Sequence, residues 1–163
     1  MRIIGIDPGT ATTGYSIVDH DNGKLSLLDY GCIRTSKGLS DAIRLQQISQ
    51  DLETLLKKWQ PSKASIEKLF FKKNIKTAIS VAQARGVIIQ KLSEKGIISN
   101  EYTPLEIKTS VCGYGRADKK MVQQMVKIIM GLKLAPKADD AADAIAAAIC
   151  LANSLSLEAR IKV

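Results

Sequence analysis

The sequence has few of the residues that carry nucleophilic or zinc-dependent chemistry. Its 163 residues include one histidine and three cysteines. The histidine, His20, precedes Asp21-Asn22-Gly23, a hairpin-turn sequence, so we expect a solvated turn residue and no His-dependent catalytic triad. Cys32, Cys112 and Cys150 are odd in number and far apart, which fits neither a disulfide framework nor a zinc site. We expect these cysteines to be reduced and without a part in catalysis.

Long hydrophobic runs and targeting segments are also missing. No apolar run reaches the roughly 18 residues of a membrane-spanning helix, and the stretch before Asp7 is too short for a secretory signal peptide. We therefore expect a cytoplasmic protein without a membrane partner. The chain shows no internal repeat and no low-complexity linker, and its length suits one domain. We expect that domain over residues 1–154, followed by a frayed tail over 155–163.

Positive charge, in contrast, is abundant. Twenty-four Lys and Arg residues against sixteen Asp and Glu residues give a formal net charge of +8 and a pI near 9.4. A surplus of this size favours a polyanionic partner. The basic residues are scattered along the chain and are not gathered on one amphipathic helix, which favours nucleic acid over a membrane surface.

The order of the predicted elements indicates the fold class. A short apolar run up to Asp7, the alternating stretch 14–20 and the stretch 24–34 predict three strands of an antiparallel meander. Strands and helices then alternate, with strands over 63–66 and 97–102 and helices over 41–59 (after the N-cap Ser40), 74–94, 118–130 and 139–153. This order predicts an α/β protein with one five-stranded mixed sheet, three antiparallel strands followed by parallel ones, flanked by helices on both faces.

The first predicted strand ends at a carboxylate. Pro8 has no N–H for a sheet ladder and Gly9 tolerates positive φ, so the chain turns directly after Asp7. An acidic side chain then stands at the carboxyl end of a core strand, where open α/β sheets place their sites. A turn in which Asp7 only hydrogen-bonds its neighbours explains this stretch equally well.

Three further carboxylates extend this pattern. Glu67 ends the fourth predicted strand, and if that strand lies parallel to the first, Glu67 and Asp7 emerge at the same sheet edge. Asp140 and Asp143 are three residues apart, so they share one face of an alanine-rich helix. Burying two carboxylates on such a face is unfavourable unless positive charge compensates them. The alternative, helix-start acids favoured by the helix dipole, suits Asp139 better than Asp143.

Four carboxylates without a histidine or a cysteine form an all-oxygen ligand set. Such a set suits Mg²⁺ or Mn²⁺ and not zinc. Two divalent cations about 4 Å apart support phosphodiester hydrolysis, one by activating a water and the other by stabilising the leaving oxygen. Together with the basic composition, this pattern indicates a metal-dependent nuclease.

Four segments carry a resemblance to a known family. They are Gly5–Thr10 (GIDPGT), Ile66–Phe70 (IEKLF), Gln83–Gly86 (QARG) and Asp140–Ala144 (DAADA). None is decisive alone, because an Asp-x-Gly-Thr at a strand end is common, but their order and spacing in a chain of this length are specific. Over Arg2 to Asn153, the sequence resembles the RuvC-type Holliday junction resolvases of the ribonuclease H-like fold.

The resemblance implies that Asp7, Glu67, Asp140 and Asp143 are the catalytic metal ligands, with two Mg²⁺ ions per active site that Mn²⁺ can replace. It implies a homodimer whose two sites cut symmetric strands of a four-way DNA junction and leave ligatable 5′-phosphate nicks. It also implies a part in homologous recombination and DNA repair, beside branch-migration proteins of the RuvA and RuvB type.

The resemblance further assigns roles to side chains other than the four acids. Lys108 and Lys119 match the family's two active-site lysines, although a surface salt bridge explains Lys119 equally well. Phe70 falls where the family presents an aromatic ring to unstacked bases, while either Phe70 or Phe71 also suits the core. Arg85 lies on the helix of the family's dimer interface, where plain helix packing is the alternative. The implied DNA-binding residues are Phe70, Lys72, Lys73, Arg85, Lys108 and Lys119.

Three other functions share parts of this pattern. Asp7-Pro8-Gly9-Thr10 also resembles the phosphate-binding hairpin of actin-like sugar kinases and ATPases, but those proteins close two such domains on a nucleotide, and this chain has room for one. An RNase H or a ribosomal-RNA processing nuclease would have a similar carboxylate cluster, so the acids do not exclude another substrate. A module that binds junctions without cutting them would not need four acids in register.

Overall fold

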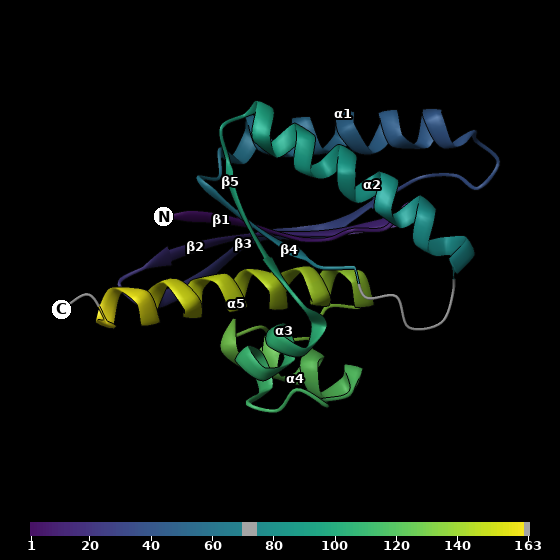
Figure 1. Ribbon diagram of the computed structural model, residues 1–163. Coiled ribbons are helices and arrows are strands. Elements are labelled where there is room, and N and C mark those ends of the chain that lie inside the picture. The colour runs from purple at the N-terminus through teal and green to yellow at the C-terminus, as the bar shows by residue number, and fades with distance from the viewer. Residues whose placement is uncertain (70–74, 162–163) are drawn as a thin grey trace.

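The computed structural model describes residues 1–69 and 75–161, which form one sheet with helices on both sides (Figure 1). The strands are β1 (Arg2–Asp7), β2 (Thr12–Asp21), β3 (Lys24–Arg34), β4 (Lys63–Glu67) and β5 (Ile98–Tyr102). The helices are α1 (Asp41–Trp59), α2 (Ile75–Glu94), α3 (Pro104–Cys112), α4 (Lys119–Ile129) and α5 (Asp139–Ile161).

The strands form one mixed sheet in the order β3-β2-β1-β4-β5. The pairs β1–β2 and β2–β3 are antiparallel, and the pairs β1–β4 and β4–β5 are parallel. The hairpin between β2 and β3 turns at Asn22 and Gly23, whose positive φ angles of 48° and 82° are those that a tight two-residue turn requires. The predicted fold, with three antiparallel strands followed by parallel ones, is confirmed.

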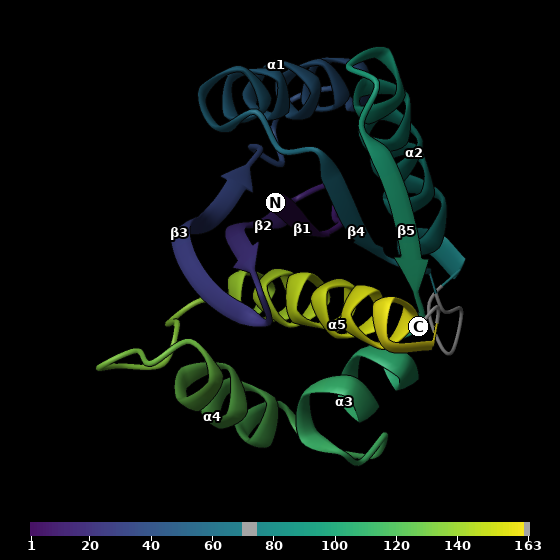
Figure 2. The ribbon, with the colours of Figure 1, turned by 90° about the vertical axis from the view of Figure 1, so that its left-hand side faces the viewer.

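Helices cover both faces of the sheet. On one face, Ile48 and Leu52 of α1 and Ile88 and Leu92 of α2 are buried against isoleucines of the strands. On the other face lies α5, and α3 and α4 pack on its outer side (Figures 1 and 2). The helix α5 is therefore enclosed between the sheet and the pair α3 and α4.

Small residues let α5 approach the sheet closely. A Cβ atom on Gly5 of β1 would overlap the carbonyl oxygen of Ala144, and the hydroxyl of Ser16 donates to that same oxygen at 2.9 Å. The hydroxyl of Ser65 on β4 donates to the carbonyl oxygen of Ala147 at 2.6 Å. These contacts reach the backbone of α5, so they hold the helix itself against three neighbouring strands.

The end of α5 and the place of His20 differ from the sequence-based expectation. The helix continues to Ile161, past the predicted helix end near Asn153. Leu155 packs beside the cluster that contains Leu151, and the Ser156 hydroxyl lies 3.2 Å from Nε2 of His20. His20 belongs to β2 and is half-buried, whereas the sequence predicted a solvated turn residue. Contacts between distant segments explain both differences.

The helix α5 is long and apolar enough to cross a membrane by length and composition. Half of its most apolar stretch is buried inside the protein, against the sheet and against α3 and α4. Core helices of soluble proteins have the same properties, so the position of α5 in the fold explains its composition.

Candidate active site

Two of the predicted carboxylates end adjacent parallel strands. In the pairing of β1 with β4, Ile6 lies beside Ile66, and Asp7 and Glu67 come next on their strands. Side chains alternate along a strand, and Gly5 and Ser65, two residues earlier, both contact α5. Asp7 and Glu67 therefore lie on the sheet face that α5 covers.

The first turns of α5 bring the other two carboxylates to the same place. Gly14 of β2 pairs with Asp7 in the sheet, and a Cβ atom on Gly14 would overlap the carbonyl oxygen of Asp140. The backbone of α5 at Asp140 thus lies against the strand next to Asp7. Asp143 follows about one turn later and lines a pocket together with Glu67.

Burial and mutual repulsion raise the pKa values of Asp7, Glu67 and Asp143. Burial raises the pKa of Asp7 to about 8, and the negative charges of Glu67, Asp143 and Asp140 add to the shift. Burial also raises the pKa of Glu67 to about 7, with the charge of Asp143 as the next cause. The pKa of Asp143 is raised by burial, which the positive charge of Lys119 partly offsets. The acids are therefore close enough for each ionised group to disfavour the ionisation of another.

The chemistry of this cluster suits a hard divalent cation. The donors are carboxylate oxygens only, and the raised pKa values of Asp7 and Glu67 indicate a need for positive charge. Among the described residues, no three His, Cys, Asp or Glu side chains stand in a ready-made ligand arrangement. The four acids fit a Mg²⁺-type ion by donor type and charge, and ligating one would bring their carboxylates closer together.

Two lysines lie with the carboxylates around a pocket of about 180 Å³. Glu67, Asp143, Lys108 and Lys119 all line it. The positive charges of Lys108 and Lys119 lower the pKa of Glu67 and so oppose the effect of burial. The structure therefore brings both predicted lysines to the predicted acids.

Asp139, to which the sequence assigned no role, holds Lys119. One of its carboxylate oxygens lies 3.2 Å from Nζ of Lys119, and the other accepts a hydrogen bond from Nε2 of Gln123 at 2.7 Å. The hydrogen bond to Asp139 is the main cause that raises the pKa of Lys119. Lys119 thus makes a surface ion pair, as the alternative explanation from the sequence predicted, and it also lines the acidic pocket.

Lys108 stands on a helix that the sequence analysis missed. No helix was predicted between the strand over 97–102 and the helix over 118–130, but α3 begins at Pro104. The Thr103 hydroxyl accepts a hydrogen bond from the N–H of Glu106 at 3.2 Å, and the Glu106 carboxylate accepts one from the N–H of Thr103 at 2.7 Å. This capping box, with Pro104 as the first helical residue, is the sequence signal that predicts the helix.

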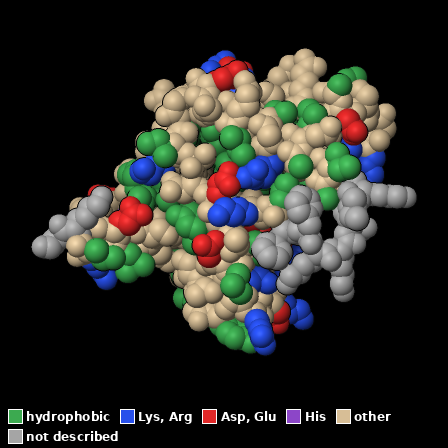
Figure 3. All heavy atoms as spheres, in the orientation of Figure 1, with side chains coloured by type: hydrophobic (Ala, Val, Ile, Leu, Met, Phe, Trp, Pro, Cys, Tyr) green, Lys and Arg blue, Asp and Glu red, His purple; other side chains and the backbone are tan. Residues whose placement is uncertain are grey.

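Arg85 is engaged within the protein. It is half-buried on α2, and its guanidinium lies 2.5 Å from the carboxylate of Glu101 on β5. Acidic and basic side chains also lie next to one another among the described residues on the face shown in Figure 3. A DNA-binding role for Arg85 stays a prediction. Phe70, Lys72 and Lys73 lie outside the described residues.

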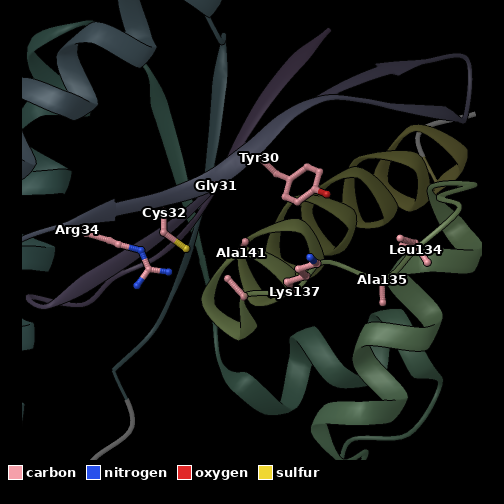
Figure 4. Close-up of a pocket in the computed structure, with 9 residues that line it drawn as sticks. Tyr30, Gly31, Cys32, Arg34, Leu134, Ala135, Lys137 and Ala141 are labelled. Atoms are coloured by element: carbon pink, nitrogen blue, oxygen red, sulfur yellow. The ribbon is translucent and has the colours of Figure 1, made fainter.

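A larger hollow of about 410 Å³ lies between β3 and the start of α5 (Figure 4). Tyr30, Cys32 and Arg34 of β3 lie across it from Lys137 and Ala141. Its walls combine apolar and basic side chains, unlike the acidic pocket. Cys32 is a free thiol, as are the other two cysteines, which agrees with the sequence-based prediction.

Comparisons with known proteins match the chain to one family. The chain matches the family model of the crossover junction endodeoxyribonuclease RuvC over residues 3–151. It is 52% identical over 155 residues to the crossover junction endodeoxyribonuclease RuvC of Fusobacterium nucleatum, covering 95% of this chain and 82% of that protein. Identity to the protein of the same name from Finegoldia magna is 52% over 150 residues, which cover 92% of each chain.

A solved structure points to the same family. The structure of T. thermophilus RuvC in complex with a Holliday junction substrate superposes with a TM-score of 0.91 and 30% identity, covering 97% of this chain and 96% of that one. The fold and the likeness along almost the whole sequence agree. The chain therefore belongs to the family of the crossover junction endodeoxyribonuclease RuvC.

Proposed function

We propose that the protein is a structure-selective endodeoxyribonuclease that resolves four-way (Holliday) DNA junctions by paired symmetric nicks with ligatable 5′-phosphate ends. The observation that carries this proposal is the carboxylate cluster at the ends of β1 and β4 and the start of α5, with two lysines beside it, in a chain of this family. The net charge of +8 supports a DNA substrate. Such an activity serves homologous recombination and DNA repair.

The four acids would hold the metal ions of this reaction. Asp7, Glu67, Asp140 and Asp143 would bind two Mg²⁺ ions, and Mn²⁺ would substitute. When bound, such ions activate a water and stabilise the leaving oxygen of the phosphodiester. A carboxyl group must be ionised to act as a ligand, and burial opposes that ionisation at Asp7 and Glu67. Cation binding and loss of the carboxyl protons are therefore coupled in this site.

The two lysines would act on the phosphate. Lys108 and Lys119 line the same pocket as Glu67 and Asp143, so their ammonium groups can stabilise the negative charge that develops on the phosphate oxygens. The backbone of α3 positions Lys108, and the ion pair with Asp139 positions Lys119. These side chains also offer positive charge to the DNA backbone before the reaction.

Paired nicks require two active sites, so the proposal includes a homodimer with one site in each subunit. The helix α2, which carries Arg85, would lie at the dimer interface. Phe70, Lys72 and Lys73 follow Glu67 closely in the sequence, and they would stack on an unpaired base and bind the backbone near the cut. Branch-migration proteins of the RuvA and RuvB type would be partners, in the cytoplasm.

The test compares a synthetic four-way junction with a matched linear duplex, each with Mg²⁺ or with EDTA. The wild type should nick the junction on symmetric strands, and only with the metal. Asp7→Asn should reduce cleavage by about 1,000-fold or more, because a catalytic ligand is lost. Junction binding by Asp7→Asn should persist, since distributed basic contacts provide it.

Other outcomes point to specific alternatives. Junction binding without any cutting by the wild type would indicate a binding module. Equal cutting of the duplex, or of an RNA–DNA hybrid, would retain the nuclease and contradict the junction as its substrate.

A further inference from the structure

A hollow of about 450 Å³ borders the carboxylate cluster on the side of α1 and α2. The turn 9–12 between β1 and β2 lines it, together with Lys37 and Arg44. Asp140 also lines it, so an occupant of this hollow would lie directly beside the acidic site. The proposed roles of the four carboxylates and of Lys108 and Lys119 do not explain what this hollow binds.

The hollow has two cationic side chains of different kinds. Lys37 is exposed and makes no ion pair within the described part of the chain. Arg44 is largely buried and oriented, because its Nε donates to the hydroxyl of Thr35 at 2.9 Å. The Thr35 hydroxyl in turn donates to the carbonyl oxygen of Thr10 at 2.6 Å, which ties the arginine to the turn. Nη1 of Arg44 also forms a long ion pair, at 3.7 Å, with the exposed carboxylate of Asp41.

The turn itself offers hydrogen-bond donors that the protein does not use. In residues 1–69 and 75–161, the backbone N–H groups of Thr10 and Ala11 donate no hydrogen bond. The Thr10 hydroxyl is buried and also lacks a partner there. The Thr13 hydroxyl donates to the carbonyl oxygen of Gly9 at 2.6 Å and fixes the shape of the turn. Unused backbone donors in a fixed turn, with cationic side chains beside them, make an anion-binding concavity.

The cationic side chains and the unused N–H donors indicate which class of ligand the hollow beside Asp140 binds. The hollow in Figure 4 has Tyr30 and Leu134 among its lining residues, so it offers an apolar surface beside its basic groups. The hollow beside Asp140 instead presents a lysine, an oriented arginine and unused N–H donors. Those groups bind a phosphate by charge and by direct hydrogen bonds.

We propose that this hollow is a phosphate subsite that binds a backbone phosphate of the DNA strand to be cut, next to the phosphate on which the four carboxylates act. The inference rests on the proposed nuclease function and adds a contact that sets the register of the strand. Lys37 and Arg44 hold the neighbouring phosphate, and the acidic site then meets one particular phosphodiester bond.

The experiment combines one variant with single neutral phosphates in the substrate. Junctions are prepared with one methylphosphonate at each position around the cut, and their binding to the wild type and to Lys37→Ala is measured in EDTA. Lys24→Ala is the matched control. Lys24 is also exposed and without an ion pair in the described residues, and it lies at the β2–β3 hairpin, at the far end of β2 from Gly14.

The wild type should lose about 10-fold in affinity when one specific phosphate beside the cut is neutral, the size of a lost charged hydrogen bond. Lys37→Ala should lose a similar factor on the unmodified junction and should not respond further to that methylphosphonate, because both changes remove the same contact. Lys24→Ala should keep the full response of the wild type.

The proposal is overturned if Lys37→Ala responds to every methylphosphonate as the wild type does, or if it weakens binding no more than Lys24→Ala. If the wild type neither binds nor cuts the unmodified junction, the proposed function itself is contradicted. The wild type is measured on the unmodified junction first, before any variant is compared. The two failures are therefore distinguishable.

Discussion

The two faces of the sheet are packed in different ways. Toward α1 and α2, large side chains such as Leu52 and Ile88 fill the space against strand isoleucines. Toward α5, glycine, serine and alanine bring the helix backbone into direct contact with the strands, as at Gly5 and Gly14. Large side chains change rotamer when a neighbour changes, whereas a peptide group in direct contact has no such freedom.

All four carboxylates belong to the face with direct backbone contact. Asp7 and Glu67 point toward it, and Asp140 and Asp143 begin the helix that covers it. Metal-ligand distances tolerate deviations of only about 0.2 Å, so a site of this kind needs accurately placed elements. The comparison indicates that the α1–α2 face mainly provides stability, while the α5 face mainly provides position.

Among the changes that test this comparison, the largest effect on cleavage should come from a single methyl group on the α5 face. In Gly14→Ala the new Cβ atom would overlap the carbonyl oxygen of Asp140, so α5 must move away from Asp7. A displacement near 1 Å at a catalytic site lowers rates by about 100-fold, and we expect at least that loss in single-turnover junction cleavage. In the control Gly38→Ala, the new Cβ atom would meet only the Ser36 hydroxyl oxygen at 3.8 Å, and activity should stay near that of the wild type.

A truncated side chain on the α1–α2 face should instead lower stability and leave cleavage nearly unchanged. Leu52 is 2% exposed, and Leu52→Ala should lower the free energy of unfolding by about 2–5 kcal/mol. Cleavage by the folded variant, well below its melting temperature, should stay within about 2-fold of the wild type, because the α5 contacts persist. Urea denaturation and single-turnover cleavage measure the two quantities. A large loss of cleavage by fully folded Leu52→Ala would show that the α1–α2 face also positions the site.

The carboxylates should make the metal-free protein less stable at alkaline pH. The pKa of Asp7 is about 8 in the folded chain against an ordinary 3.8, and that of Glu67 is about 7 against 4.5. Between these values the folded state binds more protons than the unfolded state, so the free energy of unfolding should fall from pH 5 to pH 8. Denaturation in EDTA at several pH values measures this slope. Asp7→Asn should reduce it, and an unchanged slope in that variant would contradict the pKa assignment.

The smallest effect is expected where an exposed ion pair positions a lysine. Asp139→Asn weakens the ion pair with Lys119. The side chain of Asp139 is 51% exposed and that of Lys119 is 69% exposed, so the free energy of unfolding should change by less than about 1 kcal/mol. Cleavage should fall by a few-fold, because Lys119 is held less firmly at the acidic pocket. Asp21→Asn, an equal charge change at the exposed hairpin, should leave cleavage unchanged. Equal rates for both variants would exclude a positioning role for Asp139.

Local patterns predicted the elements with strong periodicity or clear turn chemistry. The apolar run ending at Asp7 and the Asn22-Gly23 hairpin appear as expected, because each depends on neighbouring residues only. The helix α3 was missed although its capping box is visible in the sequence around Thr103 and Glu106. The assignment of Arg85 to DNA binding did not anticipate its ion pair with Glu101, since that partner lies on another element.

By itself, the sequence determined the order of the strands and of the helices other than α3, the basic charge, the acids at the strand ends and the family. Only the tertiary structure decided that Gly14 meets the backbone at Asp140, that Asp139 holds Lys119, and that a second hollow borders the acids. The physical reason is the range of the interactions. Periodicity and turn chemistry act between near neighbours, whereas backbone contacts, ion pairs and cavities arise only when segments far apart in the chain pack together.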